Sequence, residues 1–344
     1  MRQTIQRSAS RALKSGRRYS ARHHGPVRAV DLPPELASAL AGVGRGARSE
    51  AARALSERYR AGVSSAAGHA VRTPGELAAY AAVRFPATYA AARAAFTACA
   101  LADPAFAPES LLDVGTGLGA TACAALATWP SITRVTCVEP DTRAVAAGRE
   151  VLAAATDAAV EWVTGRADAV AGRRADLVTT GYVGNELADP VGFATDLWAA
   201  ADGVLVLLEP GRHDASHALL VSRAALVDAG ATTLAPCPHD NRCPLQPSDW
   251  CHFGQRLVRT AAHRQVKGAE LNHEDEKYSF VALARRPAAD RPGRVIRRPV
   301  RRKGLVELRV CAPGGIVDDR VPRSDPRHRA AKDVGWGDAW AARP

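Results

Sequence analysis

The sequence lacks a hydrophobic run long enough to cross a membrane, and it lacks an export signal. A membrane helix needs about 20 consecutive apolar residues, and no segment approaches that length. Arginines interrupt residues 1–28 throughout, so no apolar stretch of a secretory signal is present there. Seven cysteines in a chain without such signals favour reduced thiols and metal binding over disulfides. We therefore expect no membrane partner.

Lysine is scarce, and acidic residues are nearly absent from two basic segments. Only five of the 46 basic residues are lysine, which indicates G/C-rich coding and favours a cytoplasmic bacterial protein. Residues 1–29 hold eight Lys or Arg and no acid, residues 285–303 hold nine and one Asp, and the rest is net acidic. This distribution predicts a phosphate-rich partner, RNA. The Arg/Ser-rich start also resembles a transit peptide, so the mitochondrial matrix is the alternative location.

The pattern of apolar residues divides the 344-residue chain into four parts. We predict a basic disordered tail at 1–29, a helical subdomain at 30–108, a Rossmann-like domain at 109–285 with a cysteine-rich insertion at 231–254, and a basic linker, small β unit and tail at 286–344. Within 109–285, short apolar strands alternate with amphipathic helices, among them Ala120–Thr128 and Thr142–Ala155. This alternation predicts an α/β fold with a parallel, doubly wound sheet.

A glycine-rich turn follows the first strand of this pattern. Asp113 precedes Gly115, Gly117 and Gly119, which gives the D-x-G-x-G-x-G form typical of S-adenosylmethionine (SAM) methyltransferases rather than G-x-G-x-x-G. Glycines allow a tight turn and close approach of a ligand to the following helix N-terminus. We expect Asp113 to order the loop and to meet the methionine ammonium group. The sequence therefore predicts SAM binding in a class I SAM-dependent methyltransferase fold.

Two further acids follow the second and third predicted strands. Glu139 is placed to accept both ribose hydroxyls and to repel a 2′-phosphate, which argues against NADP. Asp168 is placed to reach the adenine amino group, although a solvent-facing loop acid is an equal alternative.

The turn after the fourth strand lacks the N-P-P-Y-like motif of base N-methyltransferases. Tyr182, Asn185 and Glu186 are the polar candidates there, and Glu186 is a possible general base. A helix-start role for Asn185 and Glu186 is an alternative. The catalytic residues thus stay unassigned.

Four cysteines lie outside the predicted nucleotide-binding strands. Cys237, Cys243 and Cys251 form a C-x5-C-x7-C run stiffened by prolines, and Cys311 follows much later. Four thiolates suit an iron–sulfur cluster or a structural zinc ion, and these spacings match neither standard pattern. His239 and His252 are alternative ligands.

Taken together, these motifs resemble a methyltransferase-like family of mitochondrial and bacterial small-ribosomal-subunit assembly factors. The resemblance runs from about residue 75 to 312. It includes segment 80–89, the glycine loop, Asn185–Leu187, Leu208–Gly211, the cysteine run, Glu274–Tyr278 and Cys311.

The resemblance implies a SAM-binding, methyltransferase-like protein that acts on rRNA of the small ribosomal subunit or assists its assembly. It implies a [4Fe–4S] cluster held by Cys237, Cys243, Cys251 and Cys311, with zinc as the alternative. Its expected partners are the small subunit and its rRNA, and we expect a monomer off the ribosome. A non-catalytic assembly factor, or a zinc-stabilised methyltransferase acting on another substrate, are the competing interpretations.

Overall fold

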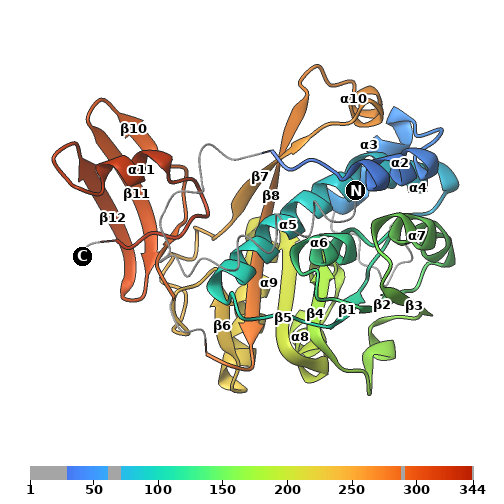
Figure 1. Cartoon of the computed structure of the whole chain (residues 1–344), viewed down its shortest axis with the longest axis horizontal. Helices are drawn as coiled ribbons and strands as arrows, with labels where there is room; N and C mark the ends of the chain where they lie inside the picture. Colours follow the sequence, from blue (N-terminus) through green and yellow to red (C-terminus); the bar gives the residue numbers. More distant parts are fainter. Residues whose placement is uncertain (1–28, 61–70, 288–290, 343–344) are drawn as a thin grey trace, which may run out of the picture.

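The computed structural model describes residues 29–60, 71–287 and 291–342. Most of the chain forms a mixed sheet with helices on both faces, and a smaller antiparallel sheet follows at the C-terminal end (Figure 1). The predicted basic tail lies outside the described residues except for Ala29. Within the described part, no helix is both long and apolar enough to span a membrane.

The central sheet has eight strands among the described residues. They are β1 (Ser110–Val114), β2 (Arg134–Glu139), β3 (Ala159–Thr164), β4 (Ala175–Gly181), β5 (Ala201–Pro210), β6 (Thr232–Ala235), β7 (Phe253–Val258) and β8 (His273–Ala284). Their order is β3-β2-β1-β4-β5-β8-β6, and β7 also pairs with β8. Strands β1 to β5 are parallel, whereas β8 is antiparallel to its neighbours. This is the strand order of the class I SAM-dependent methyltransferase fold, so the predicted Rossmann-like α/β class is confirmed.

Helices cover both faces because consecutive strand residues are apolar. Leu111 packs with one core cluster and Leu112 with the other. The helices of the first face are α2 (Pro34–Val43), α5 (Phe85–Ala102), α6 (Ala120–Thr128) and α7 (Thr142–Ala155); those of the second are α8 (Pro190–Ala200) and α9 (His213–Asp228) (Figure 1). The predicted bounds of α6 and α7 are confirmed.

The remaining helices before the sheet are α3 (Ser49–Arg60) and α4 (Pro74–Ala79), followed by a π-helical turn, η2 (Tyr80–Arg84). Pro86 explains this turn because it has no amide hydrogen to donate to the carbonyl of Ala82 four residues earlier. The turn places Tyr80 and Arg84 above the carboxyl ends of the parallel strands.

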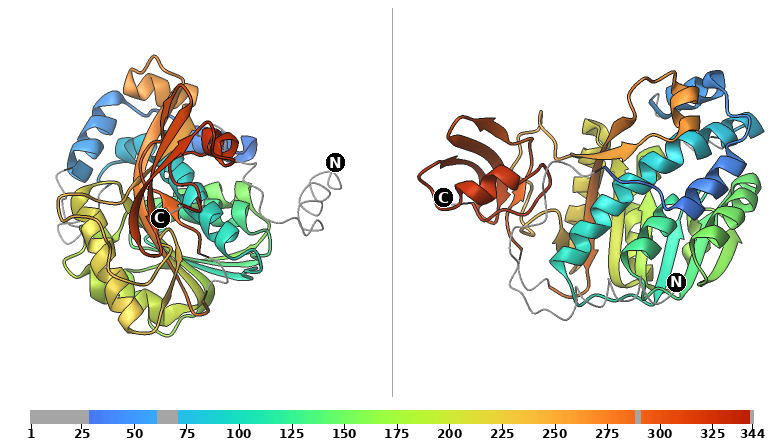
Figure 2. Two further views of the ribbon diagram at one scale, coloured as in Figure 1. Left: turned by 90° about the vertical axis from the view of Figure 1, so that its left-hand side faces the viewer. Right: turned by 45° about the horizontal axis from the view of Figure 1, so that its top comes forward.

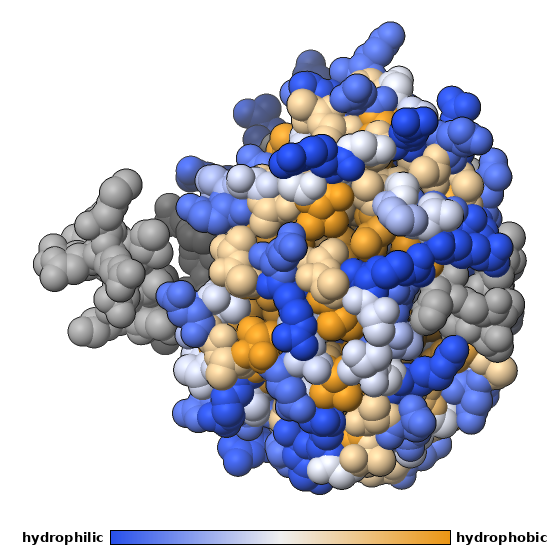
Figure 3. All heavy atoms as spheres, turned by 90° about the vertical axis from the view of Figure 1, so that its right-hand side faces the viewer, coloured by the Kyte–Doolittle hydropathy of each residue, from blue (hydrophilic) through white to orange (hydrophobic). Residues whose placement is uncertain are grey.

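Strand β8 is longer than the parallel strands and continues into an arm. Its residues 278–284 pair with β5, whereas residues 273–278 pair with β7. The arm is completed by α10 (Ala261–Lys267), which contacts α3 and η2. Figure 3 shows the face of the molecule that lies on the right in Figure 1. On this face, hydrophobic residues lie among hydrophilic ones.

A small sheet stands at one end of the molecule (Figure 2, right). It contains β9 (Arg294–Val295), β10 (Val300–Arg302), β11 (Leu305–Ala312) and β12 (Gly315–Pro322), and α11 (His328–Asp333) packs on it. It has its own apolar core. Where the sequence indicated a basic linker, the chain instead forms β9 and β10, because both pair with β11 and Val295 of β9 packs into the core of the small sheet.

Candidate functional site

The glycine loop connects β1 to α6 in a left-handed conformation. Gly115, Gly117 and Gly119 have φ values of 69°, 56° and 88°. A Cβ atom at Gly119 would lie 2.0 Å from Leu152 Cδ1, and one at Gly115 would lie 2.4 Å from Val183 Cγ2. Glycine is therefore required here both by backbone conformation and by close packing.

Asp113 is fully buried beneath this loop. Its carboxylate accepts hydrogen bonds from the hydroxyls of Thr116 (2.5 Å), Thr121 (2.7 Å) and Thr179 (2.7 Å). Burial raises the pKa of Asp113, and the three threonine hydroxyls act in the opposite direction. Asp113 orders the loop as expected, but it does not line the cavity above, so the expected contact with a methionine ammonium group has no support in this geometry.

Glu139 ends β2 and faces the same loop. Its Oε2 accepts a hydrogen bond from the Gly117 amide (2.9 Å) and its Oε1 accepts one from the Asp141 amide (3.0 Å). Glu139 also lines the cavity that lies over the loop.

A cavity of about 200 Å³ lies over the carboxyl ends of β1, β2 and β4. This is the position where the strand order reverses and where such folds bind ligands. Its wall includes Tyr80, Arg84, Gly115, Gly117, Glu139, Tyr182, Val183 and Glu186. Asp168 is exposed on a short 3-10 helix and is not part of the wall, although its neighbours Arg166 and Ala167 are.

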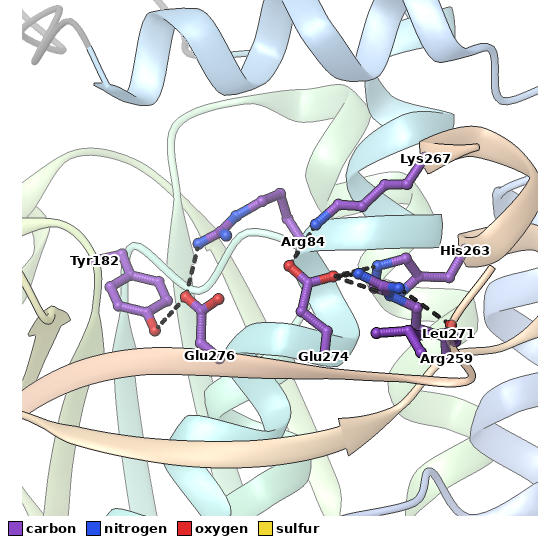
Figure 4. A network of polar contacts seen from close by, with 8 residues as sticks. All are labelled: Arg84, Tyr182, Arg259, His263, Lys267, Leu271, Glu274 and Glu276. Carbon is purple, nitrogen blue, oxygen red and sulfur yellow. Dashed lines mark hydrogen bonds and ion pairs between the residues drawn. The ribbon is translucent and has the colours of Figure 1, made fainter. Parts of the chain in front are cut away.

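Tyr182, Glu276 and Arg84 meet at the edge of this cavity (Figure 4). The Tyr182 hydroxyl donates to Glu276 Oε1 (3.0 Å), and Arg84 Nη2 lies 3.5 Å from the same oxygen. Tyr182 has a φ of 64°, and it is the sole non-glycine residue with positive φ in the described ranges. Burial raises its pKa well above the usual value, and Glu276 adds to the rise. Sequence reasoning missed Arg84 and Glu276, although both lie in segments that carry the resemblance.

A second acid on the same arm fixes α10 (Figure 4). Glu274 accepts hydrogen bonds from Arg259 (3.1 Å), His263 (3.1 Å) and Lys267 (2.5 Å). Burial alone would raise the pKa of Glu274, but these three donors lower it below its usual range. The arm that carries Glu276 is therefore anchored at its far end.

Glu186 and Asn185 both follow β4, but only Glu186 lines the cavity, whereas Asn185 binds Glu209. Glu186 lines the cavity, and its pKa is raised to about 7 by burial and by Glu139. Asn185 does not line it; its Nδ2 donates to Glu209 Oε2 (2.6 Å). Glu209 is buried and also accepts from the Gly184 amide (2.8 Å), so Asn185 holds the loop in place.

The four cysteines expected to bind metal line one cavity of about 30 Å³. Cys237, Cys243 and Cys251 lie in the cysteine loop, which we define as residues 236–252 between β6 and β7, and Cys311 lies in β11. His239 also lines the cavity, and its Nε2 lies 3.6 Å from Cys311 Sγ, whereas His252 does not line it. Within the described ranges, no three His, Cys, Asp or Glu side chains form a group that could hold a metal ion.

The thiols in this cavity influence one another. Burial raises the pKa of Cys311 to about 12, and Cys237 and Cys243 contribute to the rise. The pKa of Cys251 is raised well above its usual value by burial and then by the other three thiols. Deprotonated thiolates here would therefore need a positive partner. The other three cysteines, Cys99, Cys123 and Cys137, are buried in the main core as expected.

Several arginines of the basic segment 285–303 form ion pairs or hydrogen bonds with other residues of the chain. The pairs are Arg291 with Asp240, Arg297 with Asp249, and Arg298 with Asp275. Arg285 donates to the carbonyls of Ala201 (2.9 Å) and Trp198 (2.6 Å). The charge that predicted an RNA-binding arm is thus partly neutralised by contacts with the body.

A family model described as mitochondrial small ribosomal subunit Rsm22 matches residues 74–341. The chain belongs to this family. The Rsm22 match begins at α4 and includes the glycine loop, the cysteine loop and Cys311. The resemblance inferred from the sequence is therefore confirmed at the level of the family.

Among curated proteins, the human mitochondrial ribosome assembly protein METTL17 is 28% identical over 292 residues. The alignment covers 77% of this chain, and the chain spans 62% of the length of that relative. Among solved structures, magnesium protoporphyrin IX methyltransferase from Synechocystis is 14% identical, with a TM-score of 0.38 and coverage of 58% of this chain and 80% of that one. Ribosomal protein L11 methylase from Lactobacillus delbrueckii is 15% identical, with a TM-score of 0.36 and coverage of 56% and 77%.

Proposed function

We propose that this Rsm22-family chain binds SAM, carries a four-cysteine iron–sulfur centre and associates with small-subunit rRNA during ribosome assembly. The human relative is named a ribosome assembly protein, and the family is named for the small ribosomal subunit. The observation that carries the proposal is the meeting of Cys311 with the three loop cysteines around one cavity.

The cavity over the glycine loop supports the SAM part of this proposal. Gly115 and Gly117 of the loop line the cavity next to the N-terminus of α6, and Glu139 lies on the same wall. When bound, SAM would supply an activated methyl group. The protein's own contribution would be to hold the ligand between the glycine loop and Tyr80, and to exclude water by the arm bearing Glu276.

The donor set consists of four thiols around one cavity. Four cysteine thiolates are the usual ligands of a [4Fe–4S] cluster, and they also suit a structural zinc ion. The choice of the cluster therefore rests on the resemblance to the family, and zinc is the alternative. Cys237, Cys243, Cys251 and Cys311 would be the ligands.

The comparisons and the amino-acid composition favour different cellular locations. Both the family and the human relative are named mitochondrial, which favours the matrix, whereas the arginine-rich composition favours a bacterial cytoplasm. Either compartment contains a small ribosomal subunit, so the proposed function is the same in both.

The test is anaerobic purification followed by three measurements. Iron and sulfide analysis should give about four of each per chain, calorimetry should detect SAM binding, and sedimentation should place the protein with small subunits. The control is Cys123→Ala, which removes a thiol outside the cysteine cavity. Zinc without sulfide would refute the cluster, and failure to sediment with small subunits would refute the partner.

A second candidate, methyl transfer to rRNA, is favoured by Glu186. Its carboxylate lines the SAM cavity with a pKa of about 7, where a general base is half deprotonated at neutral pH. Transfer of labelled methyl groups from SAM to rRNA in immature subunits would support an enzyme. A SAM-binding protein that stays on the particle without transfer would be an assembly factor alone.

A further inference from the structure

Two buried arginines flank the cysteine loop. Arg223, on α9, is 2% exposed and Arg294, on β9, is 8% exposed. Burying a charged guanidinium group is costly unless an opposite charge compensates it. Neither arginine forms an ion pair with a carboxylate among the residues that the structure describes. Their charges are therefore left to be balanced by another group.

Arg223 reaches into the cysteine loop from α9. Its Nη1 donates to the Asn241 carbonyl (3.0 Å), and its Nη2 donates to the carbonyl of His239. Its Nε donates to Thr233 Oγ1 (3.1 Å) in β6. These bonds are to neutral groups, so they satisfy the donors but leave the positive charge in place.

Arg294 approaches the same loop from the small sheet. Its Nε donates to the Pro236 carbonyl (3.4 Å), next to Cys237, and its Nη1 donates to the Gly337 carbonyl (3.0 Å). It lies directly opposite Cys311 in the pairing of β9 with β11. Arg223 on α9 and Arg294 on β9 therefore both donate hydrogen bonds to backbone carbonyls of the cysteine loop.

The carboxylates of the loop are bound to other partners. Asp240 pairs with Arg291 (2.7 Å), and Asp249 pairs with Arg297. Two of the cysteines lie beside Arg294, because Cys311 is its strand partner and Cys237 follows Pro236, whose carbonyl Arg294 binds.

We propose that Arg223 and Arg294 offset the negative charge of the thiolate-bound centre and raise its reduction potential. This inference rests on the proposed iron–sulfur centre. Four thiolates give such a centre a net negative charge, and accepting one electron adds another. A nearby positive charge in a low-dielectric site stabilises the reduced form more than the oxidised form. Both arginines should also slow loss of iron.

The test compares charge-removing and charge-keeping variants of the full chain after anaerobic purification. Arg223→Met and Arg294→Met remove the charge, and Arg223→Lys and Arg294→Lys keep it. Arg285→Met is the matched control, because Arg285 also donates to two backbone carbonyls but contacts none in the cysteine loop. The midpoint potential is measured by titration with dithionite, followed at the visible absorption of the cluster, and iron release to a chelator is timed.

We expect each Met variant to show a more negative midpoint potential and several-fold faster iron release, with the Lys variants and the control near wild type. Circular dichroism checks the fold, and Arg223→Gln, which keeps a donor for the loop carbonyls, replaces Arg223→Met if that variant unfolds. If the wild-type chain contains iron but the Met variants have an unchanged midpoint potential, this inference is wrong and the proposed centre still stands. Equal shifts in Lys and Met variants overturn it too, since bonding rather than charge would then matter. A wild-type chain without iron overturns the proposed centre and the inference together.

Discussion

Replacing two glycines of the same loop by alanine should separate ligand binding from stability. At Gly119, φ is 88° and the new Cβ would lie 2.0 Å from Cδ1 of Leu152, which is 1% exposed. The left-handed backbone costs about 1–2 kcal/mol, and overpacking a core costs about 1–3 kcal/mol more. Gly119→Ala should therefore lower the free energy of unfolding by about 2–5 kcal/mol.

Gly117 has the same backbone strain without the core clash. Its φ is 56°, and the nearest atom to a new Cβ is the Tyr80 hydroxyl at 3.1 Å, on the wall of the SAM cavity. Gly117→Ala should cost only about 1–2 kcal/mol of stability. It should nevertheless weaken SAM binding at least tenfold, because the methyl group occupies the position where the ligand must approach the loop.

The assays are urea unfolding and calorimetric titration with SAM for both variants. Gly117→Ala combined with Tyr80→Phe removes the contacting hydroxyl but not the backbone strain, so it should recover neither stability nor affinity. Equal stability losses at Gly117 and Gly119 would refute the packing argument. Unchanged SAM affinity in a folded Gly117→Ala variant would refute the assignment of the loop as the cofactor site.

Three further outcomes are expected. Cys311→Ser should lose iron and make the small sheet sensitive to protease, whereas Cys123→Ala should do neither; unchanged iron and protease resistance would contradict the proposed centre. If methyl transfer to rRNA occurs, its rate should rise as the pH passes about 7 because Glu186 must lose its proton, and Glu186→Gln should remove that rise; a pH-independent rate would exclude Glu186 as the base. Burial raises the pKa of Glu209 from 4.5 to about 7. Between these two pH values the folded chain keeps a proton that the unfolded chain has released. The free energy of unfolding should therefore fall by up to about 3 kcal/mol as the pH rises from 4.5 to 7. Glu209→Gln should flatten that decline in urea unfolding followed from pH 4.5 to 7, and an unchanged slope would contradict it.

The parallel part of the sheet was predictable because its signals are local. Short apolar strands, the glycine turn and the helices Ala120–Thr128 and Thr142–Ala155 each follow from neighbouring residues. The position of Glu139 at the end of β2 follows from the same pattern. The four cysteines indicated a metal site by themselves, but the choice of a [4Fe–4S] cluster came from the resemblance, and both stay predictions.

The arm and the small sheet were not predictable in this way. Residues 273–277 are mostly charged. They form a strand because β7 pairs with them, because Glu274 pairs with Lys267, and because Glu276 pairs with Arg84, which is far away in sequence. β10 is likewise charged, and it is a strand only because β11 lies beside it. The direction in which a side chain points could not be predicted either. The Asp113 carboxylate accepts hydrogen bonds from three threonine hydroxyls and does not point into the cavity.

Strand β8 links the two sites. Glu276 binds Tyr182 at the SAM cavity, and three residues later the Ser279 hydroxyl donates to the Cys251 carbonyl (2.8 Å) in the cysteine loop. β8 pairs with both β5 and β7, so the edge of the SAM cavity and the cysteine loop are attached to one paired strand. Any effect of the centre on SAM affinity must therefore be matched by an equal effect of SAM on retention of the centre, since coupling between two binding equilibria is reciprocal.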